Sequence, residues 1–304
     1  MTFYVGIDAG GTHCRASLYD ENLHLLGTGT AGSANVFNNF TLAMQQIEHA
    51  ISLAINDANI QVDTTNIVVG AGCAGGQTGH AKQLLLEWKH PYKQFYMISD
   101  LHASCLAANQ GKHCVVVITG TGSSIAHYQN ANVTQYGGHG FIHGDEASGA
   151  WLGLNALNFL LKSYDHIVHD DVFCAAISAV LEFDYEASKS DKTKSIDAIL
   201  TRFKQKRASD YALLAPAIVN LQKSNNKTAI ALLEQGRSYL QSVLQSNKLD
   251  LDAPIFITGG LASAYHPLLE QSLNRDVVIM QTSAQQGAAL FAQVCIITTS
   301  RFND

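Results

Sequence analysis

The sequence predicts an α/β fold that consists of two copies of one unit, with a helical insertion in the second copy. Short apolar strands alternate with helices in the first third of the chain and again near its end. Three pairs of similar segments recur in the same order along the chain. The stretch from Trp151 to about Asn247 shows helical patterns and no convincing strand, which indicates the insertion.

The first copy begins as a meander of strands and continues as strand–helix pairs. Its expected strands are Tyr4–Asp8, Arg15–Tyr19, Leu25–Thr30, Ile67–Gly70 and Gln94–Ser99. Its expected helices are Leu42–Ala58, Ala81–Trp88 and Leu101–Gln110. The longest helix places Ile47, Ile51 and Ala54 on one face, which is typical of a helix that packs on a sheet.

The second copy starts with the strand Val115–Thr119, and another strand follows that ends near Tyr128. Within the insertion, Asn226–Asn247 has the pattern of one long helix. The last expected elements are the strands Ile255–Thr258 and Val277–Gln281 and the helices Pro267–Ser272 and Ala284–Gln293. The expected domains are 1–114 and 115–283, with the insertion at about 151–250 and the helix at about 284–304 packing back on the first domain.

The predicted duplication rests on three pairs of segments. Gly11-Thr12 and Gly120-Thr121 each follow one apolar strand and precede another. The segment Ile67-Val-Val-Gly-Ala-Gly resembles Ile255-Phe-Ile-Thr-Gly-Gly. The segment Tyr96-Met-Ile-Ser-Asp resembles Val278-Ile-Met-Gln-Thr, and an alanine-rich helix follows each of these two segments. One pair of glycine motifs can arise by chance, but three pairs in the same order indicate two copies of one α/β unit.

Composition excludes several classes of protein. The chain has 304 residues, of which 47% are hydrophobic and 14% charged, so it can bury a large core and is not disordered. A net charge of −6 argues against a nucleic-acid surface, and no apolar run approaches the ~20 residues of a membrane span. The first residues have the pattern of a strand and not of a signal peptide, and the six cysteines form no C-x-x-C, so we expect a cytoplasmic protein with reduced thiols.

The two glycine hairpins are the strongest candidates for chemistry. Glycine lets the backbone approach a bulky anion, adjacent N–H groups can point at it, and the threonine hydroxyl adds a donor. Two such hairpins can hold a polyphosphate, and Asp8 on the first can hold Mg²⁺ through water. Taken singly, each hairpin has the pattern of an ordinary turn. No Walker A loop exists, and Gly70-Ala-Gly72 lacks the third glycine of a dinucleotide fingerprint.

Three further polar positions each allow two interpretations. Asp100 lies between an expected strand and an expected helix, so the pattern alone favours a helix N-cap, while the alternative is a general base in phosphoryl transfer. The loop that carries Asp145 and Glu146 can bind sugar hydroxyls or cap the next helix, and Asn35 lies in a turn where it can bind a polar ligand.

Two other polar groups are not expected to bind a ligand. His139 and His143 lie four residues apart, but the glycine between them and the lack of a third ligand argue against a metal site, and the same holds for His166 and His169. The basic residues at 202–207 have the pattern of a solvated helix face.

The motifs together resemble the sugar kinase, heat-shock ATPase and actin superfamily. They are Gly6-Ile-Asp-Ala-Gly-Gly-Thr12, Gly120-Thr-Gly-Ser123, Gly144-Asp-Glu146 and Thr258-Gly-Gly260. Within that superfamily the chain is most similar to the N-acetylglucosamine kinase and bacterial glucosamine kinase group. The resemblance runs from residue 6 to about 290, and it implies a duplicated, ribonuclease-H-like fold of the actin-like ATPase type with ATP bound between two domains.

The resemblance also implies an activity, namely ATP-dependent phosphorylation of the 6-hydroxyl of N-acetylglucosamine or glucosamine, with Mg²⁺. The implied ATP and phosphate ligands are Asp8, Gly10, Gly11, Thr12, Gly120, Thr121, Gly122, Gly259 and Gly260. The implied sugar ligands are Asn35, Asp100, Ser123, Gly140 and Asp145. Asp100 would be the catalytic base and Asp8 the Mg²⁺ ligand through water. The implied partners are the amino sugar and ATP, with no nucleic acid and no membrane, and a homodimer is allowed.

The sequence departs from the group at two places. Gly137-Gly-His139-Gly stands where animal N-acetylglucosamine kinases carry a tryptophan, and Ala147 stands where glycine is familiar, so the choice between a free amine and an acetamide stays open. Two rival functions remain. One is an ATPase activator of a 2-hydroxyacyl-CoA dehydratase, which needs a cysteine-bound iron–sulfur cluster, and the other is a non-catalytic sugar-binding regulator. The Asp100 and Gly-Asp-Glu pattern favours the kinase.

Overall fold

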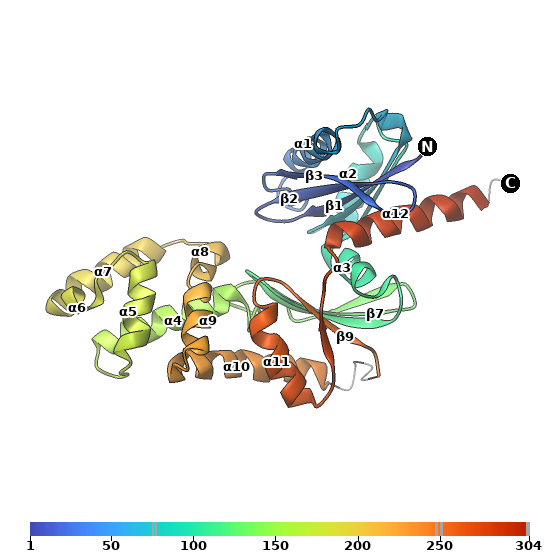
Figure 1. Ribbon diagram of the computed structural model, residues 1–304. Coiled ribbons are helices and arrows are strands. Elements are labelled where there is room, and N and C mark those ends of the chain that lie inside the picture. Colours follow the sequence, from blue (N-terminus) through green and yellow to red (C-terminus); the bar gives the residue numbers. More distant parts are fainter. Residues whose placement is uncertain (75, 77, 247–248, 250–251, 302–304) are drawn as a thin grey trace. The chain divides into compact units, whose positions relative to one another are not determined.

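The computed structural model describes residues 1–74, 76, 78–246, 249 and 252–301, and the chain divides into two compact units. Unit 1 comprises Met1–Val115, Ala126–Thr134 and Met280–Asp304, and unit 2 comprises Val116–Ile125 and Gln135–Ile279. Two five-stranded sheets form the core of the fold (Figure 1).

The first sheet lies in unit 1. Its strands are β1 (Phe3–Ala9), β2 (Cys14–Tyr19), β3 (Leu25–Ala31), β4 (Ile67–Cys73) and β5 (Gln94–Ser99). Their order is β3-β2-β1-β4-β5, with β1, β2 and β3 antiparallel to their neighbours in the predicted meander. Strands β4 and β5 add parallel to β1, and each follows a helix because a parallel pair needs a crossover connection.

The second sheet repeats this arrangement. Its strands are β6 (Cys114–Thr119), β7 (Ser123–Gln129), β8 (Asn132–Tyr136), β9 (Ile255–Thr258) and β10 (Val277–Ile279). Their order is β8-β7-β6-β9-β10, which matches the first sheet strand for strand and confirms the duplication predicted from the three segment pairs. The sheet lies mainly in unit 2, although β6, β7 and β8 each place residues in unit 1. Strand β8 was not predicted from the sequence, and β10 ends at Ile279, two residues before the predicted end at Gln281.

Helices cover both faces of the first sheet. They are α1 (Phe40–Ala58), α2 (Gly79–Glu87), α3 (Asp100–Asn109) and α12 (Ala284–Arg301), with a short 3₁₀ turn at Thr64–Asn66. Val5 and its neighbours on one face pack with α1, whereas Tyr4 and Val68 on the other face pack with alanines of α12, as the alternation along a strand requires (Figure 1). A Cβ at Gly6 or Gly70 would collide with the backbone of α12, so both glycines are needed for this close packing.

The insertion separates β8 from β9. Its helices are α4 (Gly149–Tyr164), α5 (Asp171–Val180), α6 (Tyr185–Ser188), α7 (Lys192–Phe203), α8 (Ala208–Ala212), α9 (Ala215–Lys223) and α10 (Lys227–Leu244), with a 3₁₀ turn at Lys189–Asp191. Asn226 caps α10, as the expected long helix requires, while its expected end at Asn247 lies outside the described residues. After β9, α11 (Ala262–Leu273) begins five residues before its predicted start at Pro267. The prediction placed this proline in the first turn, the position that proline favours, but it lies inside the helix.

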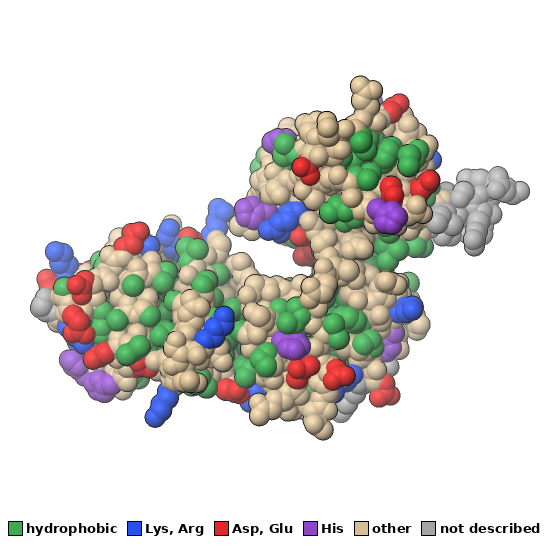
Figure 2. Space-filling model, viewed as in Figure 1, with side chains coloured by type: hydrophobic (Ala, Val, Ile, Leu, Met, Phe, Trp, Pro, Cys, Tyr) green, Lys and Arg blue, Asp and Glu red, His purple; other side chains and the backbone are tan. Residues whose placement is uncertain are grey.

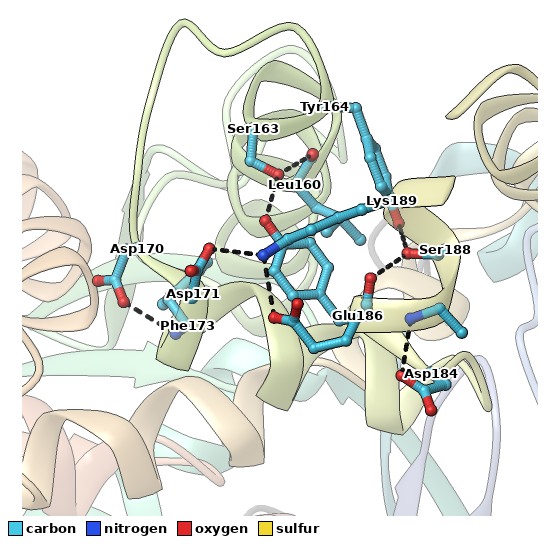
Figure 3. Close-up of polar contacts among 12 residues, drawn as sticks. Leu160, Ser163, Tyr164, Asp170, Asp171, Phe173, Asp184, Glu186, Ser188 and Lys189 are labelled. Carbon is cyan, nitrogen blue, oxygen red and sulfur yellow. Dashed lines mark hydrogen bonds and ion pairs between the residues drawn. The ribbon is translucent and has the colours of Figure 1, made fainter. Parts of the chain in front are cut away.

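Side-chain bonds hold the outer end of the insertion together (Figure 3). Lys189 Nζ bonds Asp171 Oδ1 at 3.2 Å and Glu186 Oε1 at 2.9 Å, and the Tyr164 and Ser188 hydroxyls lie 2.7 Å apart. On the face shown in Figure 2, basic and acidic side chains are interspersed over this region.

The basic stretch at 202–207 is exposed except for Phe203, as predicted, but the predicted helix face was wrong, because α7 ends at Phe203 and residues 204–207 form the turn before α8. Its Arg202 lies 4.0 Å from Glu182, and its Lys206 lies 3.8 Å from Asp210. Among the described helices, none is long and apolar enough to cross a membrane.

Candidate functional site

The first glycine hairpin connects β1 to β2 and is open to a ligand. The Gly10 N–H donates to the His13 carbonyl at 3.0 Å, and the Gly10 carbonyl accepts from the Ala34 N–H at 3.0 Å. Gly11 and Thr12 are exposed, and a Cβ added at Gly11 would meet nothing within 4 Å. The backbone at this tip can therefore be approached closely by an anion.

Asp8 lies just before this hairpin, opposite Arg15 in the β1–β2 register. Arg15 Nη1 is 3.5 Å from Asp8 Oδ2. Burial raises the pKa of Asp8, Arg15 opposes this rise, and the nearby Asp100 carboxylate adds to it. Two carboxylates therefore lie near each other in unit 1, and the arginine paired with one of them is exposed, which makes the region attractive to a cation.

Asp100 is the first residue of α3 and not its N-cap, so the prediction from pattern alone was wrong. Ser99 is the cap, because its hydroxyl accepts the His102 N–H at 3.1 Å. Asp100 Oδ1 accepts the adjacent Leu101 N–H at 3.0 Å, and burial raises the pKa of the Asp100 carboxyl despite this bond. Ser99 thus fills the N-cap position, and the Asp100 carboxylate remains partly exposed.

Gly72 explains how Asp100 and Asp8 come close. It pairs with Asp8 in the β1–β4 register, and a Cβ at Gly72 would lie 2.7 Å from Ala103 Cβ and 3.6 Å from Asp100 Cα. The absence of a side chain lets α3 begin directly against β4. From the sequence, Gly70-Ala-Gly72 was compared only with the dinucleotide fingerprint, and the packing of α3 against Gly72 was not predicted.

Asn35 lies in the loop after β3, next to the first hairpin through the bond between Ala34 and Gly10. Asn35 Oδ1 accepts the N–H groups of Phe37 at 3.0 Å and Asn38 at 3.2 Å. These bonds hold the side chain in place and leave its Nδ2 amide to a ligand. The turn and the binding interpretation of Asn35 are therefore compatible.

The second hairpin, between β6 and β7, is held by the first turn of α4. The Gly120 N–H donates to the Gly122 carbonyl at 2.9 Å. The carbonyls of Gly120 and Thr121 accept the N–H groups of Gly149 at 2.7 Å and Ala150 at 3.1 Å. Ser148 caps this helix by accepting the Trp151 N–H at 3.0 Å.

Asp145 faces the second hairpin. Its Oδ1 accepts the Gly140 N–H at 3.0 Å, and a Cβ at Gly122 would lie 2.7 Å from its Oδ2. Burial raises the pKa of Asp145, although the Gly140 N–H opposes the rise. The Ser123 hydroxyl donates to the Glu146 carbonyl. The structure thus brings together Gly140, Asp145 and the hairpin with Ser123, all within unit 2.

Two features of the Asp145 loop were not seen in the sequence. The hydroxyl of Tyr239 on α10 lies against Gly137, and burial, Glu146 and Asp145 raise the pKa of this tyrosine, which places it beside the acidic pair. Ala147 is fully buried with φ of 65°, a left-handed conformation in which glycine is unstrained. This conformation gives a physical reason for the familiar glycine at that position, and Ala147 Cα lies close to Gly236 of α10.

Gly259 and Gly260 form the turn before α11. Gly259 has φ of 104°, and a Cβ there would collide with the Thr119 carbonyl, which itself accepts the Leu261 N–H at 3.0 Å. A cavity of about 450 Å³ opens beside this turn. Its lining includes Gly120, Thr121, Gly260, Ser263, Ala215, Pro216, Val219, Asn220 and Lys223. The wall from α9 was missed because that helix carries no motif.

The predicted site residues therefore fall into two groups. Unit 1 holds Asp8, Gly10, Gly11, Thr12, Asn35 and Asp100, and unit 2 holds Gly120, Thr121, Gly122, Ser123, Gly140, Asp145, Gly259 and Gly260. Within the described ranges, no cluster of three or more His, Cys, Asp or Glu residues is arranged to hold a metal ion.

The duplicated sheets and paired glycine hairpins define the class of two-domain α/β proteins that includes actin-like ATPases and sugar kinases. The chain belongs to the BadF/BadG/BcrA/BcrD ATPase family, which it matches over residues 5–292.

Individual relatives span nearly the whole chain. The glucosamine kinase GspK of Vibrio cholerae is 27% identical over 293 residues, which cover 96% of each protein. The N-acetyl-D-glucosamine kinase of Dictyostelium discoideum is 25% identical over 318 residues, covering 95% of this chain and 97% of the relative. A crystal structure from Chromobacterium violaceum, provisionally named an N-acetylglucosamine kinase, has a TM-score of 0.82 at 22% identity and covers 96% of this chain and 99% of that one. This last likeness concerns the fold.

Proposed function

We propose that this chain is an ATP-dependent amino-sugar kinase that phosphorylates the 6-hydroxyl of N-acetylglucosamine or glucosamine. The observation that carries the proposal is the partly buried Asp100 carboxylate, which is not the N-cap of α3 and lies near Asp8 beside an open glycine hairpin. Phosphoryl transfer needs such a carboxylate to orient a hydroxyl and accept its proton. The two kinases named above, each similar over almost its whole length, support the same activity.

In the proposed reaction Asp100 takes the proton of the 6-hydroxyl while that oxygen bonds to the γ-phosphorus and the bond to the β-phosphate oxygen of ATP breaks. A raised pKa suits this role, because a carboxylate that holds its proton more tightly is a stronger base. Asp145 accepts hydrogen bonds from sugar hydroxyls, the Asn35 amide donates one, and Gly140 and Ser123 complete the sugar contacts.

The nucleotide is assigned to the two hairpins and to the cavity beside Gly260. The glycines of both hairpins allow close approach of the phosphates to backbone N–H groups. The small and apolar side chains of Ala215, Pro216 and Val219 give the cavity a wall suited to a nucleobase. Asn220 and Lys223 add polar groups at the same wall.

Asp8 is the residue that would hold Mg²⁺, through water. The charges fit a cation, because the Asp8 carboxylate lies near that of Asp100, and its ion-pair partner Arg15 is exposed to solvent. When bound, the ion would neutralise negative charge that develops on the transferred phosphoryl group. The proposal places the enzyme in the cytoplasm, where ATP is available, with the amino sugar and ATP as its partners.

The rival ATPase activator gains no support from the cysteines. A cluster held between two subunits needs exposed cysteines, yet Cys14, Cys73, Cys105, Cys114 and Cys174 are buried. Cys295 on α12 is partly exposed. One partly exposed cysteine per chain is a poor ligand set for such a cluster.

The test is ADP release from Mg·ATP with glucosamine, N-acetylglucosamine, N-acetylmannosamine and glucose, with the 6-phosphate product identified by ³¹P NMR. We expect one amino sugar to be preferred, and its identity decides between amine and acetamide. If no sugar raises ADP release above the basal rate while calorimetry shows ATP binding, the proposal is wrong, and the iron content of the purified protein then tests the activator.

A further inference from the structure

Helix α8 lies directly on α4. A Cβ at Gly153 of α4 would collide with the Tyr211 carbonyl on α8, and a Cβ at Gly149 would lie 3.2 Å from Ala212 Cβ. Glycines four residues apart line one side of a helix, so together they let the two backbones meet without intervening side chains. Because Gly149 also donates to Gly120, the position of α8 is tied to the second hairpin.

The end of α8 borders the cavity assigned to the nucleotide. Ala212, the last residue of α8, and Ala215, the first of α9, both line this cavity. A ligand that fills the cavity therefore contacts the segment that directly follows Tyr211.

The Tyr211 ring contacts the loop that carries Asp145. Its centroid is 4.8 Å from that of Phe141, tilted by 45°, and 4.9 Å from that of Phe203, tilted by 48°. Phe141 directly follows Gly140, whose N–H holds Asp145 Oδ1. Tyr211, Phe141 and Phe203 are all partly exposed, so the stack lies at the surface of the insertion and not in its core.

We infer that Tyr211 is a positioning residue that couples the nucleotide cavity to the sugar loop, through its ring contact with Phe141. The inference rests on the proposed function, since that proposal assigns ATP to the cavity and the sugar to Asp145 and Gly140. When ATP fixes Ala212 and Ala215, the Tyr211 ring holds Phe141, and the Gly140–Asp145 pair keeps the geometry that binds the sugar. Sugar binding is therefore stronger in the presence of nucleotide.

The first arm of the test is steady-state kinetics with the preferred sugar. We expect Tyr211→Leu to raise the sugar KM about fivefold, the size expected for a lost aromatic pair, and to leave the ATP KM within about twofold. Tyr211→Phe keeps the ring and should behave as the wild type. Phe203→Leu is the matched control, because it removes a ring contact of Tyr211 with nearly the same centroid distance that does not involve the Asp145 loop, and it should change neither KM.

The second arm does not depend on turnover. The chain has two tryptophans, and Trp151 lines a cavity of about 200 Å³ together with Phe141 and Asp145. In a Trp88→Phe background, a non-hydrolysable ATP analogue should change Trp151 emission, and Tyr211→Leu should abolish this change while calorimetry still shows analogue binding. Phe141→Leu removes the contact from the loop side and should have the same effect, which covers the case that Tyr211→Leu does not fold.

Two results overturn the inference. One is an unchanged sugar KM and an unchanged emission response in Tyr211→Leu or Phe141→Leu. The other is an equal rise of both KM values in Tyr211→Leu and Phe203→Leu, which indicates a purely structural role. If no sugar is phosphorylated by the wild type but the emission response depends on Tyr211, the proposed substrate fails and the coupling of cavity to loop stands.

Discussion

The two glycine hairpins occupy equivalent places in the two sheets, yet their surroundings differ. Around the first, a Cβ at Gly11 meets nothing within 4 Å, and the charged Asp8 lies at the end of the strand. Around the second, Gly122 lies against the Asp145 carboxylate, and α4 holds the Gly120 carbonyl. Duplication has preserved the backbone of the motif while the neighbouring side chains have diverged.

The ends of β1 and β6, just before the two hairpins, differ in the same way. Asp8 in β1 carries a partly exposed carboxylate, whereas Thr119 at the end of β6 is fully buried and its hydroxyl donates to the Thr258 carbonyl at 3.4 Å. The first copy thus has two carboxylates near an exposed hairpin, and the second has a hydrogen-bonded hairpin beside a cavity. Under the proposed function, the base and the Mg²⁺ ligand therefore lie in the first copy, and the nucleotide cavity and Asp145 lie in the second.

The sharpest way to break this division is Asp100→Asn. We expect kcat to fall by about 10²- to 10⁴-fold, because the amide cannot accept the hydroxyl proton, while the sugar KM changes little. The measurement is coupled ADP release with calorimetry of sugar binding. Turnover close to that of the wild type would remove Asp100 as the base.

A matched pair of glycine variants tests the two hairpins against each other. Gly122→Ala places a Cβ 2.7 Å from Asp145 Oδ2, so it should displace that carboxylate and raise the sugar KM about tenfold. Gly11→Ala enters open space and should leave the sugar KM unchanged. Asp145→Ala sets the upper limit of the effect. Equal responses of the two alanine variants would contradict the difference drawn between the hairpins.

The pH dependence of stability sharpens the comparison further. Because burial raises the pKa of Asp100, the folded protein holds this proton to a higher pH than the unfolded chain, so the free energy of unfolding falls as pH rises through the folded pKa. Asp100→Asn should therefore have a higher Tm than the wild type near pH 8, and the gain should disappear toward about pH 4. Calorimetry at several pH values measures it.

The control for that experiment comes from the second copy. The Asp145 carboxylate accepts one backbone N–H, as Asp100 does, but His139 in addition favours its charged form, so Asp145→Asn should give a smaller gain near pH 8. If the Tm gain of Asp100→Asn did not change with pH, burial of the charged Asp100 carboxylate would not be the cause of that gain.

The smallest expected effect belongs to Ala147→Gly. Relief of the left-handed strain at φ of 65° should exceed the entropy that glycine loses on folding, by about 0.5 kcal/mol, and raise Tm by about 1 °C. Ala131→Gly, at a similar φ of 60° in the β7–β8 turn, is the matched control outside the site. A fall in Tm at Ala147 alone would show that its buried methyl group matters more than its backbone strain.

Much of the fold could be predicted because its signals are local. The strand patterns and glycine turns at Gly11 and Gly120 gave the duplication before any tertiary contact was known. Strand β8 was missed because only parts of it are shielded from solvent, so it lacks an apolar alternation. The N-cap at Ser99 was missed because serine and aspartate both cap helices and stand side by side.

The site could be predicted only where motifs mark it. The wall formed by Ala215, Pro216 and Val219 depends on how α9 packs beside a distant hairpin, and no local pattern encodes that packing. The roles of Gly72 and Gly153 have the same origin, since a missing side chain becomes informative only when the neighbouring helix is known.

The packing of α12 on the first sheet has a consequence for biosynthesis. Gly6 and Gly70 are made early, but the helix segment at Gln285 and Ala288 that covers them is made last. While the ribosome synthesises the insertion and the second sheet, the nascent chain therefore carries an uncovered sheet face at Tyr4 and Val68. We therefore expect truncation before Ala284 to leave this apolar face exposed and to destabilise the first domain.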